Sequence, residues 1–373
     1  MISRDQTGSG QRFSCSAVTK LLDMRDGYAP IRNILGMSDP SVARVDGRWT
    51  MFIGGMGAAF RTNLLTARLP EGDTLASDRW EFELVPGSRW RAQRLIPQPP
   101  RGSWNRCLHS VCHVRGRVDG VDVERIYHAG RSAETVLSTT SPYRIGFLER
   151  RNGRWVARPQ PLEIAGLGTG KGVLEPKVEH VDGSWHLRYL ALTQPGDDKD
   201  GNHTILYSRS ADGVTGWSEP TVFSDASAGY YDSVALPDRA GSGYLLALTR
   251  DSNLFGKPNY PSQGLWLADS ADYATSLRGW SSPSLVVDPD DDRDGWYRGG
   301  MCSPSLQWSD DPDEPDVLYA FFVTATEHCP WPARAVRALR AGHLPPVPSP
   351  FYFAVGKARI EVHPRRTIPK SSL

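Results

Sequence analysis

Short apolar runs separated by turns recur along the chain and predict its secondary structure. In residues 38–55, SDPSVARVDGRWTMFIGG, an Asp-Gly pair joins two runs rich in β-branched and aromatic residues. This arrangement is typical of a β-hairpin. Asp39 and Pro40 stand at the head of the first run, so Asp39 is either a turn residue or a carboxylate of a functional site.

Five segments begin with the same kind of strand, a polar lead residue followed by Val or Leu. They are SDPSVARV from residue 38, LHSVCHV from 108, LEPKVEHV from 174, YDSVALP from 231 and CSPSLQW from 302. An aromatic-rich return run and a third run follow each of them. Fourth runs open on Trp80, Trp155, Trp217 and Trp280, and the fifth candidate is ARIEVHP. Four strands repeated five times predict an all-β fold, a five-bladed β-propeller of antiparallel strands with its active site in the central channel.

A pair of β-sandwiches is the alternative, but it would not place a tryptophan at the same point of successive units. We expect these tryptophans to pack between blades rather than to bind a ligand. Residues 1–26 are predicted to be a mobile or ring-closing extension, and residues 27–373 a single propeller domain. A proline-bracketed insertion at about 329–350 is expected to carry a short helix around 333–341 and could wall a pocket.

Composition and charge argue against a nucleic-acid-binding protein and against a membrane-spanning protein. The formal net charge of the 373 residues is +1 and there is no long basic run, which argues against nucleic acid as a partner. No apolar run reaches the roughly 20 residues that span a bilayer, and residues 1–16 lack the apolar core of a signal peptide. We therefore expect a cytoplasmic protein without a membrane partner. The sequence does not indicate the oligomeric state.

Five scattered cysteines do not form a disulfide framework. Cys107 and Cys112 lack the second pair of ligands that a zinc site requires, so we expect them to be buried apolar residues. The acidic run at 288–295 lacks the ligand spacing of a calcium loop and is expected to be solvated.

The first strand of each propeller blade lines the channel, so the five lead residues should converge on the axis. They are Asp39, His109, Glu175, Asp232 and Ser303. Three of them are carboxylic acids. Cleavage of a glycosidic bond needs two such groups, one acid for the departing oxygen and one base for water.

These features resemble glycoside hydrolase family 43 and, more distantly, family 32. Asp39 in SDPSVARVDGRWTMF matches the strand that carries the family's general base, and Glu175 in LEPKVEHVDGSWHLRYLA matches that of its general acid, with a spacer one residue shorter. The resemblance implies hydrolysis of a furanoside or small pentose-like glycoside by single displacement. Its substrate would be a small molecule or an oligosaccharide.

Two positions depart from that family. His109 stands where the family has an aspartate that tunes the acid, and a cationic histidine there would lower the pKa of Glu175 rather than raise it. Ser303 stands where the family often has a histidine, sometimes beneath a metal. We therefore expect no cofactor and no metal, and an inherited calcium site is not supported.

Several further residues are candidates for substrate contact. Asp232 could contact the ligand or replace the missing tuning carboxylate. Lys177 should share a face with Glu175 because side chains alternate along a strand, and it could bind an anionic group or neutralise a carboxylate. Arg131, Arg250 and Arg298 could face the channel mouth or be solvated surface residues. Ser303 completes the set.

Three functions remain open from the sequence. The first is a glycosidase with Asp39 as base and Glu175 as acid. The second is an enzyme of a small-molecule biosynthetic pathway that uses His109, with the carboxylates, for non-hydrolytic acid/base chemistry. The third is a non-catalytic sugar-binding propeller, since one scaffold hosts many functions.

Overall fold

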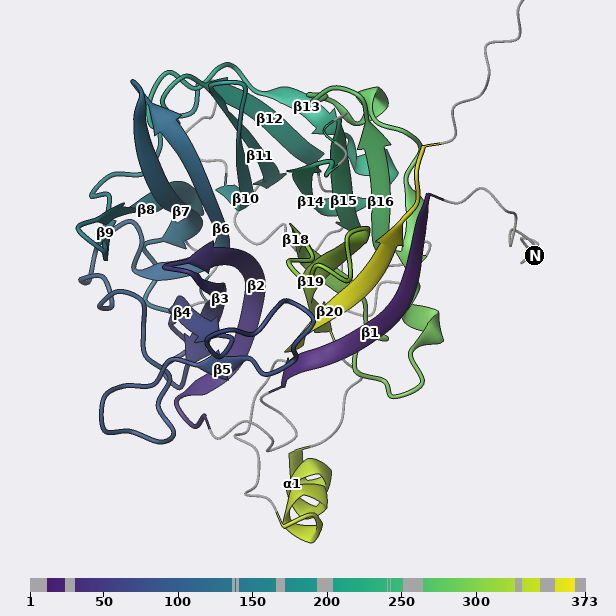
Figure 1. Cartoon of the computed structure of the whole chain (residues 1–373). Helices are drawn as coiled ribbons and strands as arrows, with labels where there is room; N and C mark the ends of the chain where they lie inside the picture. Colours follow the sequence, from purple (N-terminus) through teal and green to yellow (C-terminus); the bar gives the residue numbers. More distant parts are fainter. Residues whose placement is uncertain are drawn as a thin grey trace, which may run out of the picture.

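Five four-stranded antiparallel sheets surround a central axis (Figure 1). The computed structural model describes residues 12–23, 31–135, 138, 141–165, 172–192, 204–239, 241, 243–250, 264–325, 331–342 and 353–365. The innermost strands of the five sheets contact one another around the axis. The predicted five-bladed propeller is confirmed.

Each blade is one sheet whose strands follow one another from the axis outward. Blade one contains β2 (Ile34–Val45), β3 (Arg48–Gly57), β4 (Thr62–Arg68) and β5 (Glu81–Phe82). Blade two contains β6 (Cys107–Val118), β7 (Val121–Arg131), β8 (Arg144–Arg151) and β9 (Arg154–Ala157). Blade three contains β10 (Gly172–Val181), β11 (Ser184–Leu192), β12 (Thr204–Ser210) and β13 (Thr221–Ser224). Blade four contains β14 (Tyr230–Pro237), β15 (Tyr244–Arg250), β16 (Leu265–Ser270) and β17 (Ser284–Val287).

The fifth blade is assembled from both ends of the described chain. It contains β18 (Met301–Trp308), β19 (Val317–Ala325), β20 (Phe353–Val362) and, as its outer strand, β1 (Phe13–Asp23). β1 pairs antiparallel with β20 from Phe13 opposite Val362 to Asp23 opposite Ala354. The fourth strand of this blade is therefore N-terminal, and the assignment of ARIEVHP to that strand was wrong because these residues continue β20.

Short turns with positive φ close the inner hairpins. Asp46 and Gly47, Asp119 and Gly120, and Asp182 and Gly183 have φ between 48° and 78° and join β2 to β3, β6 to β7 and β10 to β11. Two successive positive φ angles define the type I′ turn, whose twist matches that of paired strands. The Asp-Gly turns thus determine the register of three of the strands that line the channel.

The hydrophobic core consists of five clusters, one at each interface between neighbouring blades. Trp80 belongs to the cluster between blades five and one. Trp217 belongs to the cluster between blades two and three, and Trp280 to the cluster between blades three and four. Trp155 packs against the cluster between blades one and two and meets Phe52 edge-on. The prediction that these tryptophans pack between blades is confirmed.

Trp185 is the largest fully buried side chain and lies between blades two and three. Its ring contacts Tyr127 and the guanidinium of Arg125, which lies 4.8 Å from the ring. We expect Trp185→Ala to lower the free energy of unfolding by about 3 to 5 kcal/mol, because it removes a large, fully buried side chain and leaves a cavity between the two blades. Urea unfolding measures this. Trp90 is 49% exposed, so Trp90→Ala is a matched control that should change stability by less than about 0.5 kcal/mol.

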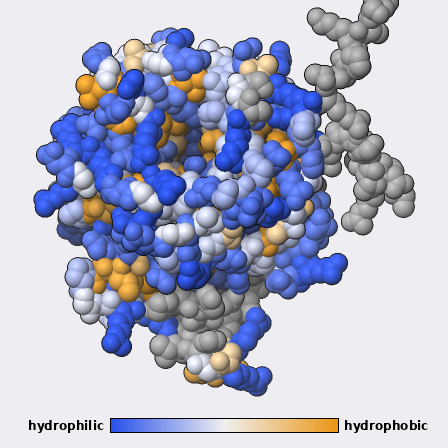
Figure 2. Space-filling model, viewed as in Figure 1, coloured by the Kyte–Doolittle hydropathy of each residue, from blue (hydrophilic) through white to orange (hydrophobic). Residues whose placement is uncertain are grey.

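The remaining helical structure is small. Between β19 and β20, α1 (Trp331–Arg340) lies outside the ring (Figure 1). Within the described ranges, three 3₁₀ turns cover Ala226–Ala228, Leu277–Gly279 and Pro289–Asp291. None of the described helices has the length and apolarity needed to cross a membrane. The face shown in Figure 2 is mainly hydrophilic and is hollowed near its centre.

Candidate active site

The innermost strand of every blade has a bulge where it approaches the channel. The pairing register shifts between Ser38 and Ser41, His109 and Val111, Leu174 and Lys177, Tyr230 and Asp232, and Cys302 and Ser305. Bulges turn side chains away from the regular alternation of a strand and are common beside active sites. The repeated bulge is what brings residues from different blades together.

Four bulge residues have a left-handed backbone although none is glycine. The φ angles are 53° for Asp39, 46° for Ser110, 50° for Glu175 and 54° for Ser303. Such a conformation costs on the order of 1 to 3 kcal/mol per residue, and outside tight turns it is often found at functional sites. Pro40, Pro176 and Pro304 follow three of these residues, where the missing N–H removes no strand hydrogen bond.

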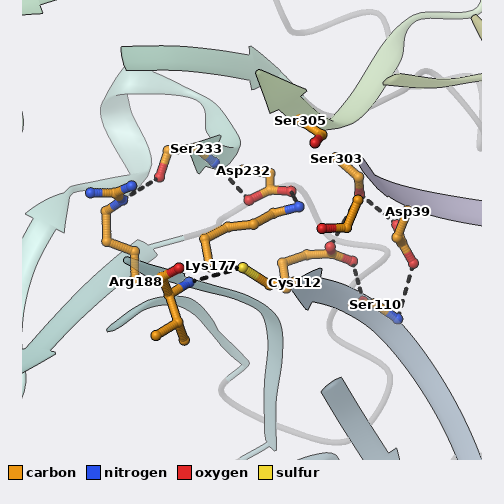
Figure 3. A network of polar contacts seen from close by, with 12 residues as sticks. Asp39, Ser110, Cys112, Lys177, Arg188, Asp232, Ser233, Ser303 and Ser305 are labelled. Atoms are coloured by element: carbon orange, nitrogen blue, oxygen red, sulfur yellow. Dashed lines mark hydrogen bonds and ion pairs between the residues drawn. The ribbon is translucent and has the colours of Figure 1, made fainter. Parts of the chain in front are cut away.

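The four side chains form one buried polar cluster (Figure 3). The Ser303 hydroxyl lies 2.5 Å from Asp39 Oδ1 and 3.1 Å from Glu175 Oε2. The backbone N–H of Ser110 donates to Asp39 Oδ2 at 3.1 Å, and its hydroxyl donates to Glu175 Oε1 at 2.8 Å. Asp39 and Glu175 are each 2% exposed. The two carboxyls predicted to be base and acid therefore share one site.

The hydrogen bonds of Ser303 are compatible with one proton on this pair of carboxyls. A serine hydroxyl has a single proton to donate and can also accept. Ser303 lies within hydrogen-bond distance of both Asp39 and Glu175, so it can donate to only one of them. The other contact is favourable only if that carboxyl is itself protonated and donates to Ser303 Oγ. The shorter contact is with Asp39, as expected if Ser303 donates to an ionised Asp39 and accepts from a protonated Glu175.

The electrostatic surroundings shift the pKa values of the two carboxyls in opposite directions, and they too favour the proton on Glu175. Burial raises the pKa of Glu175, and the negative charges of Asp39 and Asp232 raise it further, well above its ordinary value. Burial also opposes ionisation of Asp39, but His109, the Ser303 hydroxyl and Lys177 outweigh it and lower the pKa of Asp39. These surroundings favour the protonated form of Glu175 and the ionised form of Asp39.

Lys177 and Asp232 form a buried ion pair next to Glu175. Lys177 Nζ lies 3.0 Å from Asp232 Oδ2, and the side chains are 3% and 2% exposed. The ammonium approaches at ion-pair distance, but outside the orientation of a good hydrogen bond. Of the two roles that the sequence left open for Lys177, the structure shows the pairing with a carboxylate.

His109 lies at the exposed edge of the cluster. Its Nδ1 atom is 2.7 Å from the Ser110 hydroxyl and 3.4 Å from Asp39 Oδ2, and its side chain is 22% exposed. The sequence had placed His109 at the lead position of blade two, but that was one residue off because Ser110 is the bulge residue there. His109 therefore lies beside Asp39 and Ser110 at the edge of the cluster. It does not lie between the two carboxyls.

Arg131 approaches this cluster through an aromatic ring. Its guanidinium lies 4.7 Å from the ring of Tyr143, and that ring lies 6.1 Å from the ring of His109, measured between centroids. Arg250 packs on Trp266, with 4.4 Å between guanidinium and ring.

Arg298 is exposed and donates to the backbone oxygen of Asp292 at 2.7 Å. Among the described residues, neither Arg250 nor Arg298 is bonded to Asp39 or Glu175. Arg131 connects to the cluster through Tyr143.

Ser110 and Tyr143 are the site residues that sequence reasoning missed. In blades one, three and five a proline follows the bulge residue and marks its position in the sequence. Blade two has no such proline and has His109, Ser110 and Val111 in succession. Either polar residue could occupy a one-residue bulge, so the sequence held no signal that distinguishes them. Tyr143 precedes β8 and enters the site from a loop.

Asp39, His109 and Glu175 are the described residues that could hold a metal ion together. One ligand atom from each lies within 4.8 Å of the other two. This set of one imidazole and two carboxylates does not suit calcium, which takes six to eight oxygen ligands. The serine hydroxyls already contact both carboxyls, and Lys177 supplies a cation. The expectation that the protein uses no cofactor stays a prediction.

Solved structures of glycoside-acting enzymes share this architecture. The α-L-arabinofuranosidase from Podospora anserina, in complex with cellotriose, has a TM-score of 0.54 and 14% identity over 93% of this chain and 96% of its own. That of Lactobacillus brevis has a TM-score of 0.55 and 13% identity over 92% of both chains. A thermostable family-43 glycoside hydrolase has a TM-score of 0.51 and 14% identity over 91% of this chain and 97% of its own.

The fold is that of these glycoside hydrolases. The resemblance noticed in the sequence is therefore confirmed at the level of the propeller. No protein-family model and no curated protein matches the sequence. At these low identities the shared fold does not transfer an activity, which has to be argued from the site itself.

Proposed function

We propose that this protein is a glycoside hydrolase-like enzyme that acts on a furanoside or small pentose-like glycoside. The observation that carries the proposal is the buried pair of Asp39 and Glu175 with one hydroxyl between them, in surroundings that lower the pKa of Asp39 and raise that of Glu175. Two titratable groups whose surroundings push their pKa values apart are the usual sign of an acid and a base. The named activities of the structural neighbours agree with this substrate class.

Glu175 is the proton donor in this proposal. Its Oε2 atom lies 3.1 Å from the Ser303 hydroxyl, so a glycosidic oxygen that takes the place of this hydroxyl would lie within reach of the acid. Protonation of the departing oxygen removes the need to expel a strongly basic alkoxide. Asp39, held as an anion by His109 and Lys177, is the base or the stabiliser of the positive charge on the sugar.

The separation of the carboxyls bears on the course of the reaction. Ligand oxygens of Asp39 and Glu175 lie within 4.8 Å of each other. Inverting glycosidases space these groups by about 6.5 to 9.5 Å to admit a water, and retaining ones by about 5 to 5.5 Å. Single displacement, which the sequence led us to expect, therefore requires the substrate to part the two side chains. The anomeric form of the first product, read by NMR, distinguishes the two courses.

A second candidate function rests on the exposure of His109. It is the most exposed member of the cluster, and its Nδ1 atom faces Ser110 and Asp39. This leaves Nε2 as the nitrogen available to a substrate for non-hydrolytic acid/base chemistry. In this alternative the carboxyls orient His109 and do not react.

A panel of aryl glycosides separates the two candidates. We expect wild-type protein to release the aryl group from an arabinofuranoside or a related pentoside, and His109→Gln to lower that activity without abolishing it, because Lys177 and the Ser303 hydroxyl still favour the ionised form of Asp39. Release of chromophore at neutral pH is the measurement. Absence of hydrolysis across furanosides and pyranosides, with a non-hydrolytic reaction that His109→Gln abolishes, would favour the second candidate and overturn the first.

A further inference from the structure

A groove between the neighbouring blades three and four opens at the ends of β10 and β14, away from the candidate active site. Its volume is about 540 Å³, which is within the range of small-molecule sites. Asp182 lines the groove and directly follows β10, seven positions beyond Glu175. At roughly 3.3 Å per residue, on the order of 20 Å of strand separates the groove from the carboxyl cluster. The groove is therefore not part of that site.

Four aromatic side chains line the groove. The ring of Tyr273 lies 4.4 Å from that of His186 and 5.4 Å from that of Tyr244, measured between centroids. The hydroxyl of Tyr207 lies 2.7 Å from His186 Nδ1. Tyr207 and His186 are buried, whereas Tyr244 and Tyr273 are half-buried. Burial lowers the pKa of His186 to about 4, so this part of the lining is uncharged at neutral pH.

Hydrogen bonds fix the position of Tyr273. Its hydroxyl donates to Glu179 Oε2 at 3.1 Å and accepts a hydrogen bond from Arg188 Nη1 at 2.7 Å. Arg188 is 1% exposed and also forms an ion pair with Glu179. A surface that is already ordered loses little conformational entropy when a ligand binds. This network therefore preorganises the aromatic lining of the groove.

Charged side chains of both signs also line the groove. Asp182 and Asp272 are exposed, and within the described ranges neither side chain has an ion-pair or hydrogen-bond partner. Arg209 is exposed as well. Asp238 is already paired with Arg12 at 2.6 Å. Two carboxylates and one guanidinium are thus available to a ligand.

This combination of groups suits a neutral sugar. Carboxylates accept hydrogen bonds from hydroxyl groups, and a guanidinium donates hydrogen bonds to hydroxyl and ring oxygens. The C–H faces of a sugar ring pack on the negative faces of aromatic rings. A cationic ligand would be repelled by Arg209, and an anionic one by Asp182 and Asp272.

We infer that the groove between blades three and four is a second, non-catalytic binding site for a neutral oligosaccharide. Tyr244 and Tyr273 pack against the sugar rings, and Asp182, Asp272 and Arg209 bind their hydroxyl groups. The inference goes beyond the proposed function and does not depend on it, because binding in this groove requires no proton transfer in the channel.

Isothermal titration calorimetry with xylotriose and arabinotriose tests this site. The full chain carries Glu175→Gln, so that neither probe is consumed during the titration. We expect Asp272→Ala in this background to weaken binding at the groove by at least about tenfold, the usual loss for a hydrogen bond to a charged group. Tyr244→Ala should weaken the same binding, because it removes one of the rings that pack against the sugar. Circular dichroism verifies the fold of both variants.

Asp122→Ala is the matched control, because Asp122 is an exposed aspartate that pairs with Arg117 on blade two. It should bind both trisaccharides as the parent does. Affinity and stoichiometry that are equal in the parent, Asp272→Ala and Tyr244→Ala would overturn the inference. Binding of tetramethylammonium without binding of either trisaccharide would overturn it too, since the groove would then be a cation site.

Hydrolysis of a small aryl furanoside separates this inference from the proposed function. With Glu175 intact, Asp272→Ala should hydrolyse this substrate at the wild-type rate, because the substrate reaches the channel without the groove. If wild type hydrolyses no glycoside but Asp272→Ala weakens trisaccharide binding, the second site stands and the proposed function falls. If wild type is active and neither variant changes binding, the second site falls alone.

Discussion

Glu175→Gln is expected to lower kcat for an alkyl furanoside by about 10²- to 10⁴-fold, the usual contribution of a general acid. Glutamine is close in shape to the protonated acid and can keep the contacts with Ser110 and Ser303, so the fold should be preserved. It has no acidic proton to give to the departing oxygen. Initial rates of product formation, with KM determined separately, measure the loss.

Glu124→Gln serves as the control for this substitution, because it removes a carboxylate from a network distant from Ser303. It should leave kcat within about twofold of wild type if the loss is specific to proton donation. Wild-type activity in Glu175→Gln on an alkyl substrate would exclude Glu175 as the acid.

Asp39→Asn is expected to cause a loss of similar size, about 10²- to 10⁴-fold in kcat, because the amide can neither accept the proton of water nor act as an anion. It has a second consequence. The charge of Asp39 helps to raise the pKa of Glu175, so without it that pKa falls. The alkaline limb of the residual activity should then move to lower pH, which a pH–rate profile measures.

Asp122 provides the control for Asp39→Asn. It is an exposed aspartate that pairs with Arg117 on the surface, so Asp122→Asn should change neither kcat nor the profile. If Asp39→Asn lowers the rate but leaves the alkaline limb in place, Asp39 and Glu175 do not interact as the structure indicates. If the rate is unchanged as well, Asp39 is a structural turn residue.

The blade pattern could be predicted from the sequence because its signals are local. Asp46-Gly47 and its counterparts determine turns of two residues, and the alternating apolar runs beside them determine which side chains face the neighbouring blade. The closure of the ring could not be predicted in this way. The pairing of β1 with β20 joins residues more than 300 positions apart, and both ARIEVHP and the N-terminal strand have the composition of an outer strand.

The site could be predicted only in part, because the sequence does not always show which residue occupies the bulge of an innermost strand. Asp39 and Glu175 each precede a proline, which marks the position where strand pairing is interrupted. Blade two lacks that mark, so the one-residue difference between His109 and Ser110 was not visible. The partnership of Lys177 with Asp232 depends on how two blades face each other, which no local pattern encodes.

One measurement tests the central claim most directly: the activity of Glu175→Gln on two substrates that share a sugar and differ in the leaving group. An alkoxide must be protonated as it departs, whereas dinitrophenolate is a stable anion and needs no acid. We expect the loss relative to wild type to be about 10²-fold or more for the alkyl furanoside and within about tenfold for the dinitrophenyl furanoside. Equal losses on both substrates would contradict the assignment of Glu175 as the proton donor in the channel.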